Sequence, residues 1–261
     1  MDRTLFRKRV RGIAAKLGIL RPLRKLVFRM RGGKPGNDDR VFLKRFIGSD
    51  SLVFDVGANR GQSSELYIDL GAKVVAFEPQ TDLHPEIRQL CRNSPKLKIE
   101  PCGLGSKEET RRFFITSYDQ VASLRDDWEG TRIGETTIQV STLDLQIARH
   151  GVPSYCKIDV EGWELEVLQG LSQPIPLISF EYHNSPAELE KARAVLDRVG
   201  TLGSYHCNIK EPASTDFLMD RFLPINEFSR LFPDGLRPAL QGGYGDIFCV
   251  IDVLLIRPFQ P

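Results

Sequence analysis

Long apolar runs and closely spaced cysteines are both missing from this chain of 261 residues. A membrane-spanning helix needs roughly 18 apolar residues, and the most apolar stretch, 247–256, is interrupted by Asp252. The basic N-terminal segment has neither the continuous apolar stretch nor the small-residue cleavage site of a secretory signal. The five cysteines include no C-x-x-C pair, which argues against a zinc site or a disulfide framework. We therefore expect free thiols and a cytoplasmic location.

Charge is distributed unevenly along the chain. Residues 1–47 contain 15 Lys or Arg and 3 Asp, a balance of +12, whereas the remainder contains 21 basic and 31 acidic residues, a balance of −10. Apolar residues between Phe6 and Met30 recur at alternating steps of four and three, which is typical of one face of a helix. Because 32–37 is rich in glycine, we predict a basic N-terminal helical arm with its linker at 1–36, and a second domain at 37–261.

Three functions of this arm remain open. It could pack on the domain, lie on an anionic membrane surface, or bind nucleic acid. The apolar stripe disfavours nucleic acid, because an arm that binds only phosphates does not need apolar residues. We expect no DNA partner, and the sequence does not indicate an oligomeric state.

From residue 51 onward, short apolar runs alternate with helical patterns, which is typical of an α/β domain with a mainly parallel sheet. The predicted strands are 52–54, 74–77, 97–100, 155–158, 177–180, 205–209 and 247–255. The predicted helices are 63–70, 82–93, 143–149, 163–169 and 185–199, and 113–115 with 136–140 is predicted as a hairpin-like insertion. Ser141 and Asp144 have the spacing of a pair that caps the helix at 143–149.

A turn that contains glycine connects the first predicted strand to a helix, in Phe54-Asp55-Val56-Gly57-Ala58-Asn59-Arg60-Gly61. Gly57 and Gly61 allow the backbone to bend and a ligand to approach the unpaired N–H groups of the helix N-terminus. The turn lacks both the G-x-G-x-x-G of dinucleotide-binding folds and the Gly-Lys-Ser/Thr of a phosphate-binding loop. The Asp55 carboxylate would repel a pyrophosphate but could accept hydrogen bonds from a cationic, amino-acid-like group. Taken alone, the turn is also compatible with a purely structural role.

An acid follows the next predicted strand, in Val74-Val75-Ala76-Phe77-Glu78-Pro79. A carboxylate at this place can accept hydrogen bonds from both hydroxyls of a ribose, although a Glu at a strand end can also be simply exposed. Together, Asp55 and Glu78 indicate a nucleoside that carries a positively charged tail. S-adenosylmethionine fits this description better than NAD.

Two further strand ends carry acids and a histidine. Asp159 and Glu161 lie at the end of strand 155–158, where alternation would put them on the same side if the strand continued. Glu181 and His183 are again two residues apart, after the next strand. Ligands of open α/β sheets bind outside the carboxyl ends of the strands, and histidine is the side chain that titrates near neutral pH. These residues therefore predict a catalytic site.

In these motifs, in Ser141-Thr142-Leu143-Asp144 and above all in Lys157-Ile158-Asp159-Val160-Glu161-Gly162, the sequence resembles the FkbM-type methyltransferases, a branch of the class I S-adenosylmethionine-dependent enzymes. The resemblance implies a Rossmann-like α/β fold with a mainly parallel seven-stranded sheet and helices on both faces. It also implies a set of cofactor-binding residues: Asp55, Gly57, Asn59 and Gly61 for the methionine end, Glu78 for the ribose, Cys102 near the adenine, and Asp159 near the methyl donor.

The resemblance further implies O-methylation of natural products or surface glycans. A sugar hydroxyl is a poor nucleophile until it is deprotonated, so we predict an O-methyltransferase in which His183 or Asp159 is the general base. Glu161 and Glu181 would orient the base or bind hydroxyls. A divalent metal ion held by these four side chains is a competing arrangement that we do not favour, and we assign no metal ligand.

Other functions also fit parts of the sequence. An RNA methyltransferase would explain the basic arm, but the arm has no aromatic-rich platform on which bases could stack. A methyltransferase of a non-sugar small molecule with a divalent metal is a second alternative. An NAD-dependent oxidoreductase is disfavoured by the altered glycine pattern, and a non-catalytic binding protein by the number of acids at strand ends. The amphipathic arm favours an acceptor at the cytoplasmic membrane face, such as a lipid-linked saccharide.

Overall fold

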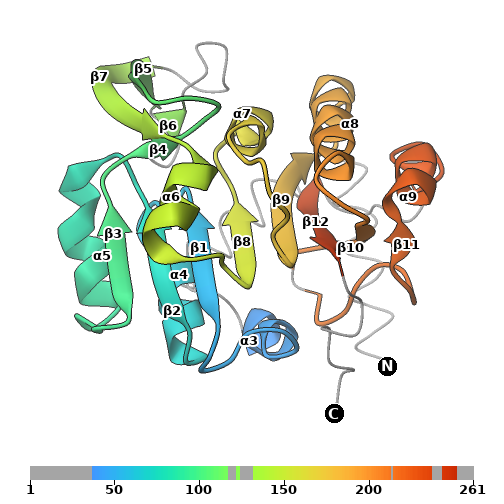
Figure 1. Cartoon of the computed structure of the whole chain (residues 1–261), viewed down its shortest axis with the longest axis horizontal. Helices are drawn as coiled ribbons and strands as arrows, with labels where there is room; N and C mark the ends of the chain where they lie inside the picture. Colours follow the sequence, from blue (N-terminus) through green and yellow to red (C-terminus); the bar gives the residue numbers. More distant parts are fainter. Residues whose placement is uncertain (1–36, 117–121, 124–131, 213, 237–242, 252–261) are drawn as a thin grey trace, which may run out of the picture. The chain divides into compact units, whose positions relative to one another are not determined.

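The computed structural model describes residues 37–116, 122–123, 132–212, 214–236 and 243–251, so the predicted arm at 1–36 lies outside the described residues. An eight-stranded sheet has the order β11-β10-β12-β9-β8-β1-β2-β3 (Figure 1). Its strands are β1 (Leu52–Val56), β2 (Lys73–Phe77), β3 (Leu97–Glu100), β8 (Tyr155–Ile158), β9 (Leu177–His183), β10 (His206–Lys210), β11 (Leu223–Pro224) and β12 (Tyr244–Val250).

Five neighbouring strands of this sheet are parallel. β1 pairs in parallel with β2 and β8, β2 pairs with β3, and β8 pairs with β9. β12 is inserted antiparallel between β9 and β10, and the two-residue β11 forms the edge. The mainly parallel sheet with seven principal strands is confirmed. Because the carboxyl ends of β1, β2, β8 and β9 meet at one edge, the motifs that follow these strands converge there.

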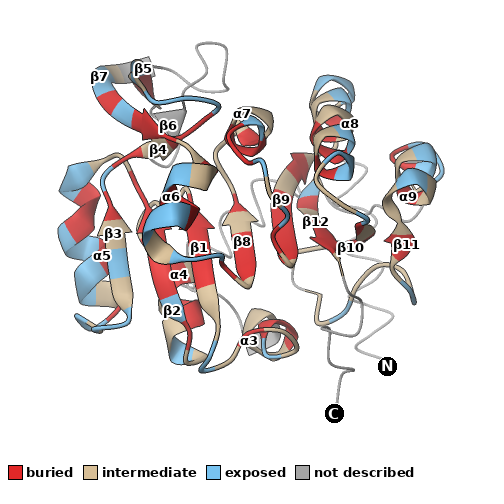
Figure 2. Cartoon of the chain, in the orientation of Figure 1, coloured by how far each residue is buried: buried red, intermediate tan, exposed pale blue. Residues whose placement is uncertain are grey.

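Helices cover both faces of the sheet, as predicted. One face packs on α3 (Asn37–Leu43), α4 (Gln62–Asp69) and α5 (His84–Leu90). The other face packs on α6 (Leu143–His150), α7 (Glu164–Gln169), α8 (Pro186–Gly200) and α9 (Ile225–Leu231). Within β1, Val53 belongs to the first of these cores and Phe54 to the second, which is the alternation expected of a strand. Figure 2 shows that the central strands are buried and the outer helix surfaces are exposed.

The predicted insertion is a second, four-stranded sheet with the order β4-β7-β5-β6. Its strands are β4 (Gly103–Leu104), β5 (Glu109–Thr116), β6 (Ala122–Ser123) and β7 (Arg132–Ser141), and β5 pairs antiparallel with β7 as a hairpin does. Phe113, Ile138 and Val140 of this sheet pack against Trp163, which directly precedes α7. In Figure 1 the second sheet lies at the edge to which the arrows of β1 and β8 point.

One local prediction was wrong, and one predicted helix has different bounds. The cap of α6 is Thr142, whose Oγ1 accepts a hydrogen bond from the backbone N–H of Leu145, because Ser141 is still part of β7. The helix predicted at 82–93, interrupted early by Pro85, is a short 3₁₀ turn (Thr81–Leu83) followed by α5, which already ends at Leu90; Pro85 lies in the first turn of α5, where a missing N–H costs nothing.

The described residues include all five cysteines and several helices that can be compared with the length of a membrane-spanning helix. All five cysteines are free and buried, so they contribute to the core as small apolar side chains. None of the helices in the described part of the chain is long and apolar enough to cross a membrane.

Candidate active site

Asp55 is a buried carboxylate at the end of β1 with an unused acceptor atom. Its side chain is 1% exposed, and the Ser64 hydroxyl at the start of α4 donates a hydrogen bond to Oδ2 at 2.6 Å. Oδ1 is buried and has no hydrogen-bond partner among the described residues. Burial raises the pKa of Asp55, while the nearby Lys157 ammonium opposes this shift. A ligand that brings a cationic donor to Oδ1 would remove the free-energy cost of leaving this buried oxygen without a hydrogen bond.

The loop between β1 and α4 is shaped by three residues with positive φ: Gly57 (+84°), Asn59 (+49°) and Gly61 (+86°). The bend predicted for the glycines is confirmed. The atoms that lie close to the two glycines belong to other residues of the chain, and the prediction had expected a ligand there. A Cβ on Gly57 would lie 2.0 Å from the carbonyl oxygen of Asp159, and one on Gly61 would lie 2.9 Å from Ile87 Cγ2. The glycines are therefore required for packing of the loop, whatever they do for a ligand. Asn59 Oδ1 is a second buried acceptor without a partner in the described part of the chain.

Glu78, directly after β2, is not an exposed strand-end acid. It is 4% exposed, and its two carboxylate oxygens accept hydrogen bonds from the backbone N–H groups of Asn59 and Gln80, each at 2.8 Å. Burial raises the pKa of Glu78 to about 7, although the two N–H donors oppose the shift. Glu78 thus links the loops that follow β1 and β2, and it keeps lone pairs that further donors could use.

Cys102 lies between β3 and β4, at the place where the resemblance implies the adenine. Its side chain is 8% exposed and packs in the same apolar core as Leu104. Burial raises the pKa of this thiol to about 11, so it is a neutral, apolar surface at physiological pH. Its contact with adenine stays a prediction.

These residues fit the cofactor that the sequence suggests. The unpaired oxygens of Asp55 and Asn59 suit an ammonium group, and Glu78 can accept from ribose hydroxyls. In the loop after β1, the N–H groups of Gly57 and Ala58 are donated to Phe77 and that of Asn59 to Glu78, so these three are not available to a pyrophosphate. The arrangement therefore favours a nucleoside with a cationic tail over a dinucleotide.

The end of β8 carries an ion pair that the sequence did not reveal. Lys157 Nζ lies 2.6 Å from Asp159 Oδ2, and the Asp159 N–H donates to the carbonyl of Val56 in β1. The predicted alternation of Asp159 and Glu161 along one strand is wrong, because β8 ends at Ile158 and Glu161 stands in a turn with a φ of +55°. The turn brings Glu161 into the site in a backbone conformation that is costly for a residue other than glycine.

Glu161, Glu181 and His183 nevertheless come together. One ligand atom from each of the three lies within 4.8 Å of the others, and His183 Nε2 lies 3.2 Å from Glu181 Oε2. Glu181 and His183 belong to β9 itself, which is longer than predicted, so strand alternation puts both on one face. Burial, together with the charges of Asp159 and Glu181, raises the pKa of Glu161 to about 8. This group of three side chains is called the proton-acceptor cluster below.

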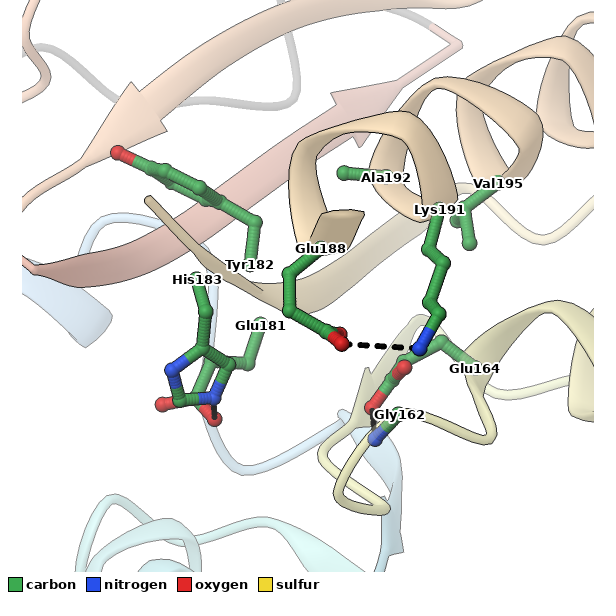
Figure 3. Close-up of a pocket in the computed structure, with 9 residues that line it drawn as sticks. All are labelled: Gly162, Glu164, Glu181, Tyr182, His183, Glu188, Lys191, Ala192 and Val195. Carbon is green, nitrogen blue, oxygen red and sulfur yellow. Dashed lines mark hydrogen bonds and ion pairs between the residues drawn. The ribbon is translucent and has the colours of Figure 1, made fainter. Parts of the chain in front are cut away.

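A small cavity of about 10 Å³ adjoins this cluster (Figure 3). Glu181 and His183 line it from β9, and α8 contributes Glu188 and Lys191, which form an ion pair at 2.8 Å. Glu164 at the start of α7 also lines it and accepts hydrogen bonds from the N–H groups of Val160 and Gly162. Burial raises the pKa of Glu164 to about 7.

Sequence reasoning missed several residues of this edge: Lys157, Glu164, Glu188, Lys191 and Asp246. Lys157 could have been found from its place two residues before Asp159, inside the most specific motif. Asp246 could not, because it joins the edge through β12, whose antiparallel insertion beside β9 no local pattern indicates.

Five parallel strands followed by an antiparallel strand between β9 and β10, with acids at the ends of β1 and β2, define a Rossmann-like class I methyltransferase. A family model described as "Methyltransferase FkbM domain" matches residues 55–206. The chain belongs to this FkbM family and is an S-adenosylmethionine-dependent methyltransferase. No curated protein matches it.

Similar solved structures include other methyltransferases at low identity. A precorrin-6y C5,15-methyltransferase from Geobacter metallireducens is 9% identical, with a TM-score of 0.43 over 82% of this chain and 87% of that chain. An rRNA methylase from Streptococcus thermophilus is 11% identical, with a TM-score of 0.44 over 82% and 93%. A geranyl diphosphate methyltransferase in complex with SAM is 11% identical, with a TM-score of 0.43 over 82% and 84%.

Proposed function

We propose that this methyltransferase transfers the methyl group to a hydroxyl, in a sugar of a glycan, glycolipid or natural product. The observation that carries the proposal is the proton-acceptor cluster of Glu161, Glu181 and His183 at the carboxyl ends of β8 and β9. The cluster lies at the same sheet edge as Asp55 and Glu78. A hydroxyl needs such a group because it must lose its proton as it attacks.

S-adenosylmethionine supplies an electrophilic methyl group on a positively charged sulfur. The chain's own residues hold the acceptor oxygen in line with that group and remove its proton. Of the two predicted bases, His183 is favoured, because the carboxylate of Asp159 is already engaged by Lys157 at 2.6 Å. The hydroxyl proton would move to the imidazole of His183 as the carbon–oxygen bond forms and the methyl–sulfur bond breaks, with S-adenosylhomocysteine as the neutral leaving group. Glu181 Oε2, at 3.2 Å from His183 Nε2, is close enough to stabilise the imidazolium by its charge.

A sugar suits the surroundings of the cluster. Tyr244 at the start of β12 is 36% exposed, and its ring centroid lies 6.2 Å from that of His183. An exposed aromatic ring beside polar groups can pack against the apolar face of a sugar.

The acidic character of the edge also bears on the RNA alternative. Besides burial, the negative charges of Asp159 and Asp246 already raise the pKa values of Glu161 and Glu181 at this edge, and a phosphate group would add to this repulsion. A neutral acceptor is therefore favoured over a polyanion at this site. The basic arm at 1–36 can still attach the enzyme to an anionic membrane that carries a glycolipid acceptor.

A metal-assisted form of the same reaction is the second candidate. The ligand atoms of Glu161, Glu181 and His183 are close enough to hold one divalent ion, which would lower the pKa of a bound hydroxyl. Turnover that is lost with EDTA and restored by Mg²⁺ or Mn²⁺ would favour this form. Turnover that is unchanged by EDTA would favour His183 as the base.

The test of the proposed function starts with S-adenosylhomocysteine binding by titration calorimetry. Neutral oligosaccharides and glycolipids are then incubated with the enzyme and S-adenosylmethionine, and a gain of one methyl in the mass of the acceptor is the expected result. His183→Ala should slow this gain by about 10²–10⁴ without loss of cofactor binding. A gain found only on RNA, or on no hydroxyl acceptor, would contradict the proposal.

A further inference from the structure

Lys157 stands in the middle of the buried polar face of the sheet. In the strand register it is opposite Asp55 of β1 on one side and Ser179 of β9 on the other. Residues that pair directly in a sheet point to the same face, so all three lie on the α4 side. The Lys157 side chain is 15% exposed, and its ammonium forms the 2.6 Å ion pair with Asp159. The proposed reaction gives this lysine no role as acid or base.

The charges around Lys157 hold it in the protonated form. Burial acts to lower its pKa, but the carboxylates of Asp159, Asp55 and Asp246 outweigh burial and raise it. The Lys157 ammonium therefore persists across the physiological pH range. A lysine that remains charged and buried beside one carboxylate restricts the positions that carboxylate can adopt.

Asp159 is fixed on its backbone side as well. Its N–H donates to Val56 at 3.0 Å, and its carbonyl oxygen packs against Gly57. Lys157 holds one oxygen of the Asp159 carboxylate. The Asp159 side chain is 32% exposed, so a ligand at the site can still reach it. Without Lys157, this carboxylate would be repelled by its acidic neighbours and would move away.

We propose that Lys157 is a positioning residue: it holds the Asp159 carboxylate at the carboxyl end of β8 so that its negative charge faces the positively charged sulfur of the methyl donor. This inference rests on the proposed function, which puts the donor at this edge. Lys157 acts through Asp159 and does not itself contact the donor.

The test compares the Kd of S-adenosylmethionine with that of S-adenosylhomocysteine, measured by calorimetry on the full chain. The two ligands differ in one methyl group and in the charge on sulfur. The ratio of the two Kd values therefore reports the charge environment of the sulfur, and any loss that affects both ligands equally cancels. The variants are Asp159→Asn, Lys157→Met, the double variant and Lys157→Arg.

Lys210→Met is the matched control. Lys210 is also buried, at 8% exposure, on the same face of the sheet, and it forms one ion pair at 2.9 Å with Asp39 of α3. Its loss removes a buried ammonium from the same polar face but leaves the Lys157 pair intact. We expect Lys210→Met to leave the ratio of Kd values within about twofold of the wild type.

We expect Asp159→Asn and Lys157→Met each to shift the ratio about fivefold or more toward S-adenosylhomocysteine. The double variant should shift it no further than Asp159→Asn alone, because both changes remove the same interaction. Lys157→Arg, which keeps the charge, should retain most of the wild-type preference. If Lys157→Met does not fold, as judged by circular dichroism, Lys157→Gln carries the same expectation.

The direction of the shift separates the explanations. If Lys157 were only a nearby positive charge, its removal would favour the cationic ligand and shift the ratio the opposite way. If Lys157 served only the fold, both Kd values would weaken together at a constant ratio. Either result, or an unchanged ratio in Asp159→Asn, would overturn the inference. A wild-type chain that binds neither ligand would instead contradict the proposed function.

Discussion

The strongest pH effect on cofactor binding should come from Glu78. Its pKa of about 7 means that about half of these side chains are protonated at neutral pH, whereas ribose hydroxyls need the ionised carboxylate as an acceptor. If only the ionised form binds, the Kd for S-adenosylhomocysteine at pH 6 is about ten times that at pH 8, or about 1.4 kcal/mol. Binding at pH 6 should release about 0.9 proton for each ligand bound.

Titration calorimetry in two buffers of different ionisation enthalpy measures both quantities. Glu78→Gln should bind more weakly and lose the pH dependence. It should also destabilise the fold by about 1–3 kcal/mol, because the amide group would face one of the two backbone N–H donors from Asn59 and Gln80. Glu86→Gln is the control, since Glu86 is an exposed acid paired with Arg60. A wild-type Kd that is constant from pH 6 to 8, or a slope that survives in Glu78→Gln, would refute the reasoning.

Glu78 should also make the stability of the fold depend on pH. The free energy of unfolding should fall as the pH rises, whereas cofactor binding should strengthen. The pKa of the folded state is above the ordinary value of 4.5, so the folded chain binds the extra proton between pH 4.5 and about 7. The stability that this proton contributes is complete below pH 4.5 and is lost as the pH rises through about 7. The loss is at most about 3 kcal/mol, and urea unfolding at pH 5 and pH 8 would measure it against Glu78→Gln.

Three further predictions follow from the fold and the sequence. His183→Ala should lower turnover by about 10²–10⁴ while the Kd for S-adenosylhomocysteine stays within about twofold; an equal loss in both would mean that His183 serves the fold. Gly57→Ala should cost about 2 kcal/mol or more in urea unfolding, because its Cβ would lie 2.0 Å from the Asp159 carbonyl at a φ of +84°, whereas Gly48→Ala, with nothing within 4 Å, should cost little. The full chain should sediment with anionic but not with neutral liposomes, and deletion of residues 1–33 should abolish this sedimentation; unchanged binding would remove the membrane role of the arm.

The sequence predicts the bounds of two strands of the sheet. Strand 155–158 lies in the buried middle of the sheet, and strand 97–100 is the partly exposed edge strand. The end of β9 was harder, since Glu181, Tyr182 and His183 read as a loop but continue the ladder beside β12. Polar residues at a strand end are stabilised here by a partner strand that is distant in the sequence.

The candidate site could be predicted from the sequence only in part. Asp55 and Glu78 were found because each follows a recognisable strand, and their burial could not be read from the sequence. Glu161 was found for the wrong reason, since a turn with positive φ, and not strand alternation, brings it to Glu181 and His183. The spacing of residues in the sequence predicts the positions of side chains only where the backbone is a regular helix or strand. The turn that carries Glu161 is irregular, so spacing does not predict its position.

The contact between Gly57 and the Asp159 carbonyl has a consequence for ligand binding. It joins the loop that follows β1, where the cofactor is expected, to the turn that carries Glu161. With no side chain between them, the two segments cannot be displaced independently, so a loop that settles around the first substrate also sets the turn for the second. We therefore expect the two binding events to be coupled, each ligand changing the affinity for the other by the same factor; equal acceptor affinity with and without S-adenosylhomocysteine would contradict this.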